Sequence, residues 1–139
     1  MAFSLGTRNA CSAQPPQWVT NLTHEVFTIE ISSIVSWEEK QMTWYNINGA
    51  PDQSDSVTVN TLIVRGTTTT NNYFVGAIPV MNEALNALGT RGVKGQTCSG
   101  ECGCQRCEFK YNTRGCDCLD AVPQPDCNAW CKHVLSSFN

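Results

Sequence analysis

Apolar and polar residues alternate along much of the first two-thirds of the chain, and this alternation predicts β-strands. Between Val26 and Trp37 the apolar residues fall on one face, and Thr28, Glu30 and Ser32 fall on the other. A period of two is typical of a half-buried strand. The apolar face of this first strand would comprise Phe27, Ile29, Ile31, Val35 and Trp37. Extended along the chain, the pattern predicts four strands, near residues 26–36, 41–47, 56–65 and 73–78.

The third of these predicted strands changes phase along its length. Its apolar positions shift from Val57 and Val59 to Leu62 and Val64. We therefore expect either a bulge near Thr61 or burial on both faces of the strand.

Short polar segments separate the predicted strands. Asn48-Gly49 is a strong turn dipeptide, and residues 66–72 (GTTTTNN) predict a hairpin loop. The strands would pack as a small antiparallel sheet around one core. The residues that we expect to be buried are Ile29, Ile31, Val59, Ile63, Val75, Leu85 and Leu88.

A helical period replaces the alternation at two places. After Pro79, apolar residues recur at helical spacing and end at Gly89, which predicts a short helix near 80–88. A second helix is predicted at the carboxyl end, with Asp126 as its cap. Its apolar stripe would comprise Cys127, Trp130, Cys131, Val134, Leu135 and Phe138.

The remaining segments indicate how the chain is organised. Pro15-Pro16 predicts an irregular amino-terminal arm over residues 1–23, because proline interrupts helices. Four glycines in residues 89–100 predict a linker over 89–97. The predicted fold class is mainly β with two short helices (α+β). We expect a β-rich core over residues 24–88 and a loop-dominated, cysteine-rich subdomain over 98–139 that ends in a helix.

Nine cysteines change this picture most, because eight of them lie between residues 98 and 131. This segment has few large apolar residues, so burial alone cannot offset its chain entropy and it needs cross-links. We favour disulfides, with zinc as the alternative because Cys104-x2-Cys107 has the usual spacing of a zinc-ligand pair. The eight candidate residues are Cys98, Cys102, Cys104, Cys107, Cys116, Cys118, Cys127 and Cys131.

The spacing of the cysteines also limits how they can pair. On a helix, Cys127 and Cys131 would have Cβ atoms about 5–6 Å apart, too far for a mutual disulfide. Each should instead bond to the 98–118 block. Because nine is odd, Cys11 would remain free, bond to another chain, or serve as a small buried apolar residue.

Charge and composition exclude several classes of function. Charged residues make up 15% of the chain and the net charge is -3, so no basic surface is expected to attract nucleic acid. No apolar run is long enough for a membrane span. The amino terminus lacks the pattern of a secretory signal. Either a signal has been removed, or the chain is made in a reducing cytosol and is oxidised later, for example in a released particle.

No arrangement of residues predicts catalysis. His133 follows Cys131 but lies off the predicted apolar stripe, and His24 precedes a strand. Adjacent Glu38 and Glu39 would point to opposite faces of an extended chain. We expect no enzymatic activity, no small-molecule substrate and, with disulfides, no cofactor.

The sequence thus favours a structural protein that assembles with other protein chains. We expect a minor virion component (capsid, decoration or fibre-associated) located in a virion or extracellular particle. Its interface would include Phe3, Leu5 and Trp18, which the amino-terminal segment cannot bury by itself. One alternative is a cytoplasmic zinc-binding interaction module that uses the Cys98–Cys131 cluster. Another is a secreted binding domain.

Overall fold

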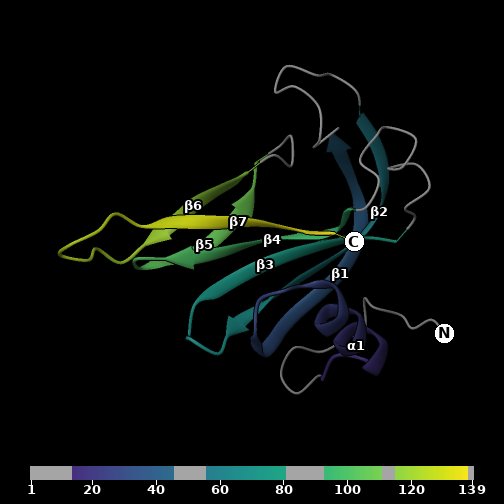
Figure 1. Ribbon diagram of the computed structural model, residues 1–139, viewed down its shortest axis with the longest axis horizontal. Helices are drawn as coiled ribbons and strands as arrows, with labels where there is room; N and C mark the ends of the chain where they lie inside the picture. Colours follow the sequence, from purple (N-terminus) through teal and green to yellow (C-terminus); the bar gives the residue numbers. More distant parts are fainter. Residues whose placement is uncertain (1–13, 46–55, 81–92, 111–114, 138–139) are drawn as a thin grey trace.

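The computed structural model describes residues 14–45, 56–80, 93–110 and 115–137 (Figure 1). Within these ranges the chain forms one helix and seven strands. The elements are α1 (Gln17–Val26), β1 (Ile31–Tyr45), β2 (Ser56–Thr68), β3 (Tyr73–Pro79), β4 (Val93–Glu101), β5 (Cys104–Phe109), β6 (Cys116–Ala121) and β7 (Trp130–Ser137).

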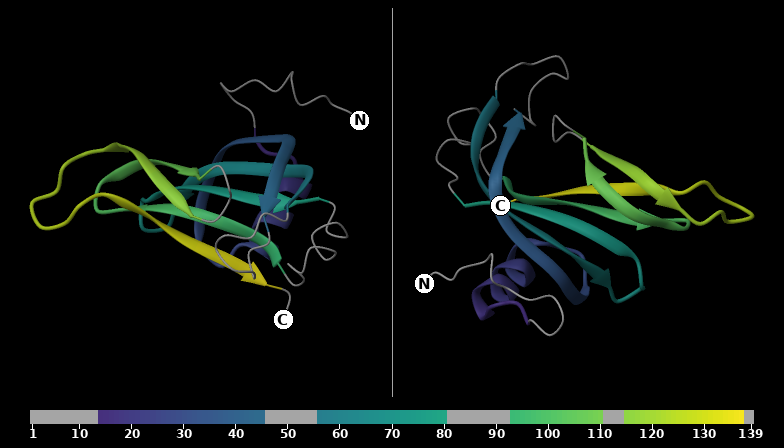
Figure 2. Two further views of the ribbon diagram at one scale, coloured as in Figure 1. Left: turned by 90° about the horizontal axis from the view of Figure 1, so that it is seen from above. Right: turned by 180° about the vertical axis from the view of Figure 1, so that it is seen from behind.

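Five of the strands form one antiparallel sheet in the order β1-β2-β3-β4-β7, and β5 and β6 form a separate antiparallel hairpin. The two views of Figure 2, together with Figure 1, place α1 and the β5–β6 hairpin on opposite sides of the large sheet. The molecule therefore has three layers, with the large sheet in the middle.

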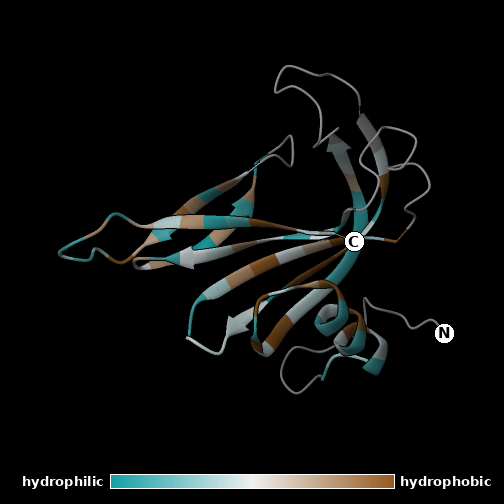
Figure 3. Ribbon diagram, viewed as in Figure 1, coloured by the Kyte–Doolittle hydropathy of each residue, from teal (hydrophilic) through white to brown (hydrophobic). Residues whose placement is uncertain are grey.

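Each face of the large sheet has its own core. Toward α1, buried Leu62 and Val64 of β2 pack in one cluster with Val19 of the helix. Toward the hairpin, Ile63 of β2 and Val75 of β3 pack with the cysteines. Figure 3 shows β3 as a largely apolar strand between the two layers. Alternate residues of β2 and β3 thus face different cores, as the period of a strand requires.

This arrangement explains the phase change in the third predicted strand. Thr61, Leu62, Ile63 and Val64 are all buried, because both faces of β2 are covered. The pairing of β2 with β3 is continuous from Thr61 onward, so the bulge expected near Thr61 is absent. The expectation of burial on both faces is confirmed.

The predicted core is confirmed in part. Val59, Ile63 and Val75 are buried as expected. Ile29 and Ile31 are half-buried at the edge of the α1-facing cluster. Leu85 and Leu88, with the helix predicted near 80–88, fall outside the described residues.

The strands predicted at 26–36 and 41–47 are joined in a single long strand, β1, which begins only at Ile31. The first prediction is wrong at its start, because Val26 ends α1 and residues 27–30 precede the strand. The polar residues from Glu38 to Gln41 continue β1 and are exposed on this edge strand of the sheet. The pairing of β1 with β2 is irregular at Val35, because the register shifts between Ile34 and Ser36. This irregularity turns the Val35 side chain outward, and Val35 is 69% exposed. Val35 does not share the buried face expected for it.

The amino-terminal arm is not wholly irregular, because Gln17–Val26 is the helix α1. Pro16 stands at the N-cap, and the N–H groups of Val19 and Thr20 donate to its carbonyl oxygen. Proline is tolerated there because a helix leaves its first N–H groups without intrahelical partners. The prediction treated Pro15-Pro16 as a barrier, whereas the helix begins directly after it.

The predicted carboxyl-terminal helix is wrong, because residues 130–137 form strand β7 at the edge of the large sheet. β7 pairs with β4 along its whole length. The helical stripe also fails as a buried face, since Trp130 is 50% exposed and Leu135 is 38% exposed. Pairing with β4 and the cross-link at Cys131 override the local helical period.

The mainly β, antiparallel and disulfide-bonded character of the fold is confirmed, with one helix in the described residues. The cysteine-rich third is built from strands and is not dominated by loops. β4 begins inside the expected linker 89–97, where Gly95 is buried. The division of the chain into arm, core, linker and subdomain stays a prediction.

Candidate functional site

Four disulfides cross-link the cysteine-rich part of the chain. Cys98–Cys116 and Cys107–Cys131 tie the β5–β6 hairpin to β4 and β7 of the large sheet, Cys104–Cys118 links the two strands of the hairpin, and Cys102–Cys127 joins the turn after β4 to the segment before β7. We call the unit formed by residues 98–110 and 115–131 the stapled region. Every pair has Cα atoms 5.8 to 6.0 Å apart, as disulfide geometry requires. The pairs are Cys98–Cys116, Cys102–Cys127, Cys104–Cys118 and Cys107–Cys131.

The pairing agrees with one spacing argument although the helix behind it was wrong. Cys127 and Cys131 do not bond to each other, and each bonds to the 98–118 block. Cys131 lies on β7 and Cys127 lies in the segment before it. Cys11 lies outside the described residues, so its state stays a prediction.

A tight turn at Cys102 and Gly103 lets β5 leave the large sheet directly after β4. Both residues have positive φ angles, 55° and 90°. The carbonyl oxygen of Gly103 accepts a hydrogen bond from the N–H of Val122, and a Cβ atom on Gly103 would lie 2.2 Å from the carbonyl oxygen of Val122. Glycine is therefore needed here both for the backbone angle and for the close approach.

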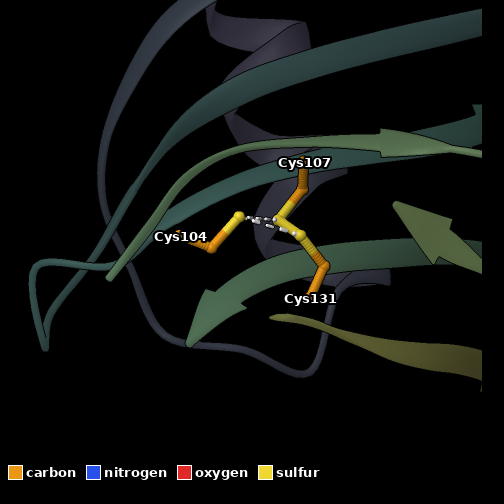
Figure 4. A group of neighbouring side chains, drawn as sticks. All are labelled: Cys104, Cys107 and Cys131. Carbon is orange, nitrogen blue, oxygen red and sulfur yellow. Dashed lines mark hydrogen bonds between the residues drawn. A yellow bond between two sulfur atoms is a disulfide. The ribbon is translucent and has the colours of Figure 1, made fainter. Parts of the chain in front are cut away.

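Two of the disulfides, Cys104–Cys118 and Cys107–Cys131, lie against each other in the core, and Figure 4 draws Cys104 beside the Cys107–Cys131 bond. The Sγ atom of Cys104 is 3.3 Å from that of Cys131 and 3.9 Å from that of Cys107. These three cysteines are buried, with at most 9% of each residue exposed. The sulfur atom of Cys118, bonded to Cys104, adds a fourth sulfur to this group.

An ion pair joins the hairpin to the large sheet. Arg65 on β2 donates to Glu108 on β5 at 2.8 Å, and Arg106 donates to the second oxygen of the same carboxylate at 3.2 Å. Burial raises the pKa of Glu108, but the hydrogen bonds and charges of Arg65 and Arg106 outweigh burial and hold this pKa below its usual value. The carboxylate is therefore ionised at neutral pH.

Open clefts flank this ion pair. One, of about 350 Å³, is lined by residues that include Val35, Tyr73 and Arg106. The other, of about 300 Å³, is lined by residues that include Lys40 and Lys110. Both have mixed polar and apolar walls, and both run along the junction between the sheet and the hairpin.

The stapled region exposes large apolar side chains. Leu119 is 59% exposed, Trp130 is 50% exposed and Val122 is 44% exposed. Leu119 is the extra residue of an irregularity in β6, where Cys107 pairs with Cys118 but Arg106 pairs with Asp120. A bulge turns such a residue away from its strand's regular face.

The structure brings together only some of the residues that the sequence analysis selected as candidate site residues. The eight clustered cysteines come together, whereas Trp18 lies on α1, where it is 45% exposed. Phe3 and Leu5 fall outside the described residues. Sequence reasoning missed the Arg65–Glu108 pair, because the two residues are 43 positions apart and only the packing of the hairpin brings them together.

His133 is half-buried and hydrogen-bonds to a buried side chain. Its Nε2 atom lies 2.6 Å from Oε1 of the fully buried Gln96, and since an amide oxygen only accepts, the ring nitrogen is the donor. Burial lowers the pKa of His133. The ring is half-buried on β7, not in solvent as the helical interpretation implied.

Comparisons with known proteins found none similar to this chain. Family models, curated protein sequences and solved structures all gave no match. Across the described ranges, no helix combines the length and the hydropathy that a membrane span needs.

Proposed function

We propose that this protein is a non-enzymatic structural component of an extracellular assembly such as a virus particle, where it binds other protein chains. The observation that carries the proposal is the exposure of Leu119, Val122 and Trp130 on a backbone held by four disulfides. These side chains form the proposed contact surface.

Two of these residues lie beside the same turn. Trp130 is opposite Glu101, the residue before the turn, and the N–H of Val122 donates to Gly103 within it. The Cys102–Cys127 disulfide closes this end of the stapled region. A surface that is already rigid loses little conformational entropy when it binds, and tryptophan is enriched among residues that dominate interface energies.

The disulfides also support an extracellular location. Four disulfides are typical of a non-reducing environment, because cytosolic reductants keep thiols reduced. A small β-rich chain in a released particle gains mechanical and proteolytic resistance from such cross-links. The low charge of the chain, 15% of residues, further favours close packing against neighbours.

Catalysis is not part of the proposal. The half-buried ring of His133 is engaged with the amide of Gln96, and His24 is exposed on α1. The carboxylate of Glu108 is held by two arginines. His133 and Glu108 are thus engaged in contacts within the fold.

Particle incorporation tests the proposal directly. The chain, expressed in its source cells, should co-sediment with released particles in a density gradient. A Val122→Asp and Trp130→Asp double variant should be incorporated about fivefold less or lower still, since losing an interface anchor costs more than about 1 kcal/mol. The amount of secreted, oxidised variant should stay unchanged.

A matched control uses Gln105, an exposed polar residue of the stapled region. Gln105→Asp should be incorporated like the unaltered chain, because Gln105 adds no apolar surface. If the chain is found only in the soluble fraction of the medium, the assembly function is wrong and a secreted binding domain is favoured. Normal incorporation of the double variant would instead show that Val122 and Trp130 are not part of the contact surface.

A further inference from the structure

Three cysteine sulfur atoms come together in the core of the stapled region, and a fourth is bonded to one of them. The Sγ atoms of Cys104, Cys107 and Cys131 all lie within 4.8 Å of one another (Figure 4). The Sγ atom of Cys118 is bonded to that of Cys104. Among the described residues, these three cysteines make up the one group of potential metal ligands with such short separations. Cys98–Cys116 and Cys102–Cys127 lie outside it.

Strand pairing positions the backbone of these four cysteines independently of the disulfide bonds. Cys107 and Cys118 are opposite one another in the β5–β6 ladder. Cys131 is held on β7 by pairing with Gly100 of β4, and Cys104 begins β5. Hydrogen-bonded strands therefore bring the four side chains to one place in the folded chain.

The separations of the sulfur atoms suit a tetrahedral metal ion. Four thiolates around zinc have Zn–S bonds of about 2.3 Å, which places neighbouring sulfur atoms about 3.8 Å apart. The two contacts between the disulfides, at 3.3 and 3.9 Å, lie on either side of this separation. Within each disulfide, the sulfur atoms would have to separate by less than about 2 Å.

We propose that in the reduced chain Cys104, Cys107, Cys118 and Cys131 bind one Zn²⁺ ion as four thiolates. Four thiols release four protons to the solvent, and the ion with its ligands carries a net charge of two minus. Cys104, Cys107 and Cys131 are buried and Cys118 is half-buried, and protein fills all four positions of the site, which is typical of structural zinc. Cys104-x2-Cys107 supplies the usual closely spaced pair.

Oxidation converts the zinc form into the disulfide form. Two molecules of a low-molecular-weight disulfide accept two electrons each from the four thiolates. The products are the Cys104–Cys118 and Cys107–Cys131 bonds, four small thiolates and free Zn²⁺. The same four residues thus stabilise the chain in a reducing compartment and in an oxidising one. This inference does not depend on the proposed assembly function.

Metal titration of the full, reduced chain tests the proposal. We expect one Zn²⁺ per chain, and with Co²⁺ as the probe, the visible absorption of a tetrahedral four-thiolate centre. Alkylation followed by mass spectrometry should show that zinc protects Cys104, Cys107, Cys118 and Cys131. Binding should also increase the near-ultraviolet circular dichroism, because zinc binding is coupled to folding.

Variants separate this site from general thiol binding. A Cys107→Ala and Cys118→Ala variant should bind Zn²⁺ about a hundredfold more weakly or worse, because two ligands are lost. The matched control, Cys102→Ala with Cys127→Ala, should bind like the unaltered chain. Cys118→His keeps a fourth ligand, so it should retain binding and shift the Co²⁺ absorption to that of three sulfur atoms and one nitrogen.

Four results would overturn the proposal, and the first three concern the reduced chain. These are the absence of stoichiometric binding to the reduced chain, the protection of cysteines outside the four, and equal loss of binding in the two double variants. Zinc binding by the oxidised chain at the same affinity would also contradict it, because disulfides leave no thiolates at this site.

Discussion

At the scale of single residues, the interior depends on hydrogen bonds that a few buried side chains make within a strand and between neighbouring strands. The indole N–H of Trp44 donates to Oγ1 of Thr61 at 3.0 Å, and both residues are fully buried. Thr61 in turn donates to the carbonyl oxygen of Val59. From the sequence, Thr61 is only a residue that favours a strand. Its role as the acceptor for the Trp44 indole N–H follows from the tertiary fold.

Thr61→Val should destabilise the protein by about 1–3 kcal/mol, because it leaves the buried indole N–H of Trp44 without an acceptor while keeping the shape of the side chain. Urea unfolding under non-reducing conditions measures this loss. Thr58→Val is the matched control, since Thr58 is exposed on the same strand, and it should change stability by less than about 0.5 kcal/mol. Equal effects of the two variants would contradict the role of the hydrogen bond.

Gly76→Ala should destabilise the protein by about 1–3 kcal/mol through overpacking. A Cβ atom there would lie 2.3 Å from the ring of Phe27, which is buried against the sheet. Gly115→Ala is the control, because its Cβ atom would meet only the flexible side chain of Lys110 at 3.3 Å. Thermal unfolding compares the two, and a Gly76→Ala variant as stable as Gly115→Ala would show that the Phe27 ring moves freely.

At the scale of elements, the β5–β6 hairpin depends on contacts that its own sequence does not supply. Its inner face packs on β2, β3 and β7 through cysteines, and the Arg65–Glu108 pair anchors it to β2. Strand β7 also depends on a contact outside its own sequence, because pairing with β4 overrides its helical spacing. Local pattern predicted β2 and β3 well because both are covered on both faces and carry continuous apolar runs.

Glu108→Gln should lower stability at pH 7 by about 1 kcal/mol or less, the usual value for a partly exposed ion pair. The pKa of Glu108 is lowered in the folded chain, so its stabilising effect is fully present above the unfolded value of 4.5 and is lost as pH falls through the lowered pKa. The difference between the two proteins should therefore shrink below pH 4.5.

Denaturant unfolding at several pH values measures this difference. Asp120→Asn, at an exposed position of β6, is the control and should change stability by less than about 0.5 kcal/mol at neutral pH. A Glu108→Gln effect that stays constant from pH 7 to pH 3 would show that the charge of Glu108 does not stabilise the fold.

At the scale of the whole molecule, the disulfides substitute for a larger core on one side of the sheet. The α1-facing side is covered by aliphatic and aromatic residues, whereas the hairpin-facing side relies on buried cysteines. All four bridges cross between strands or segments that are 14 to 25 positions apart. They therefore constrain the unfolded chain by similar amounts.

Removing one disulfide should cost about 3 kcal/mol from chain entropy alone. Cys98→Ala with Cys116→Ala should cost at least about 1 kcal/mol more than Cys102→Ala with Cys127→Ala, because Cys98 is fully buried and its loss leaves a cavity. Cys127 is exposed. Guanidinium unfolding of both variants in a Cys11→Ala background measures the difference, and equal losses would show that burial of the sulfur contributes nothing.

The sequence by itself determined the mainly β class, the positions of β2 and β3, and the need for cross-links in the final third. These follow from local alternation, from turn residues and from the ratio of apolar residues to cysteines, all of which can be read without knowing the fold. The prediction that Cys127 and Cys131 bond to the 98–118 block agrees with the structure, but the helical spacing from which it was argued is wrong, since Cys131 lies on strand β7.

The remaining features depend on contacts between parts of the chain that are far apart in the sequence. Residues 130–137 form a strand because β4 offers unpaired hydrogen-bonding groups beside them, and no local pattern contains that partner. The convergence of Cys104, Cys107, Cys118 and Cys131 likewise requires three strands to meet. Spacing restricts which sulfur atoms can approach, but the packing of the hairpin on the sheet selects the ones that do.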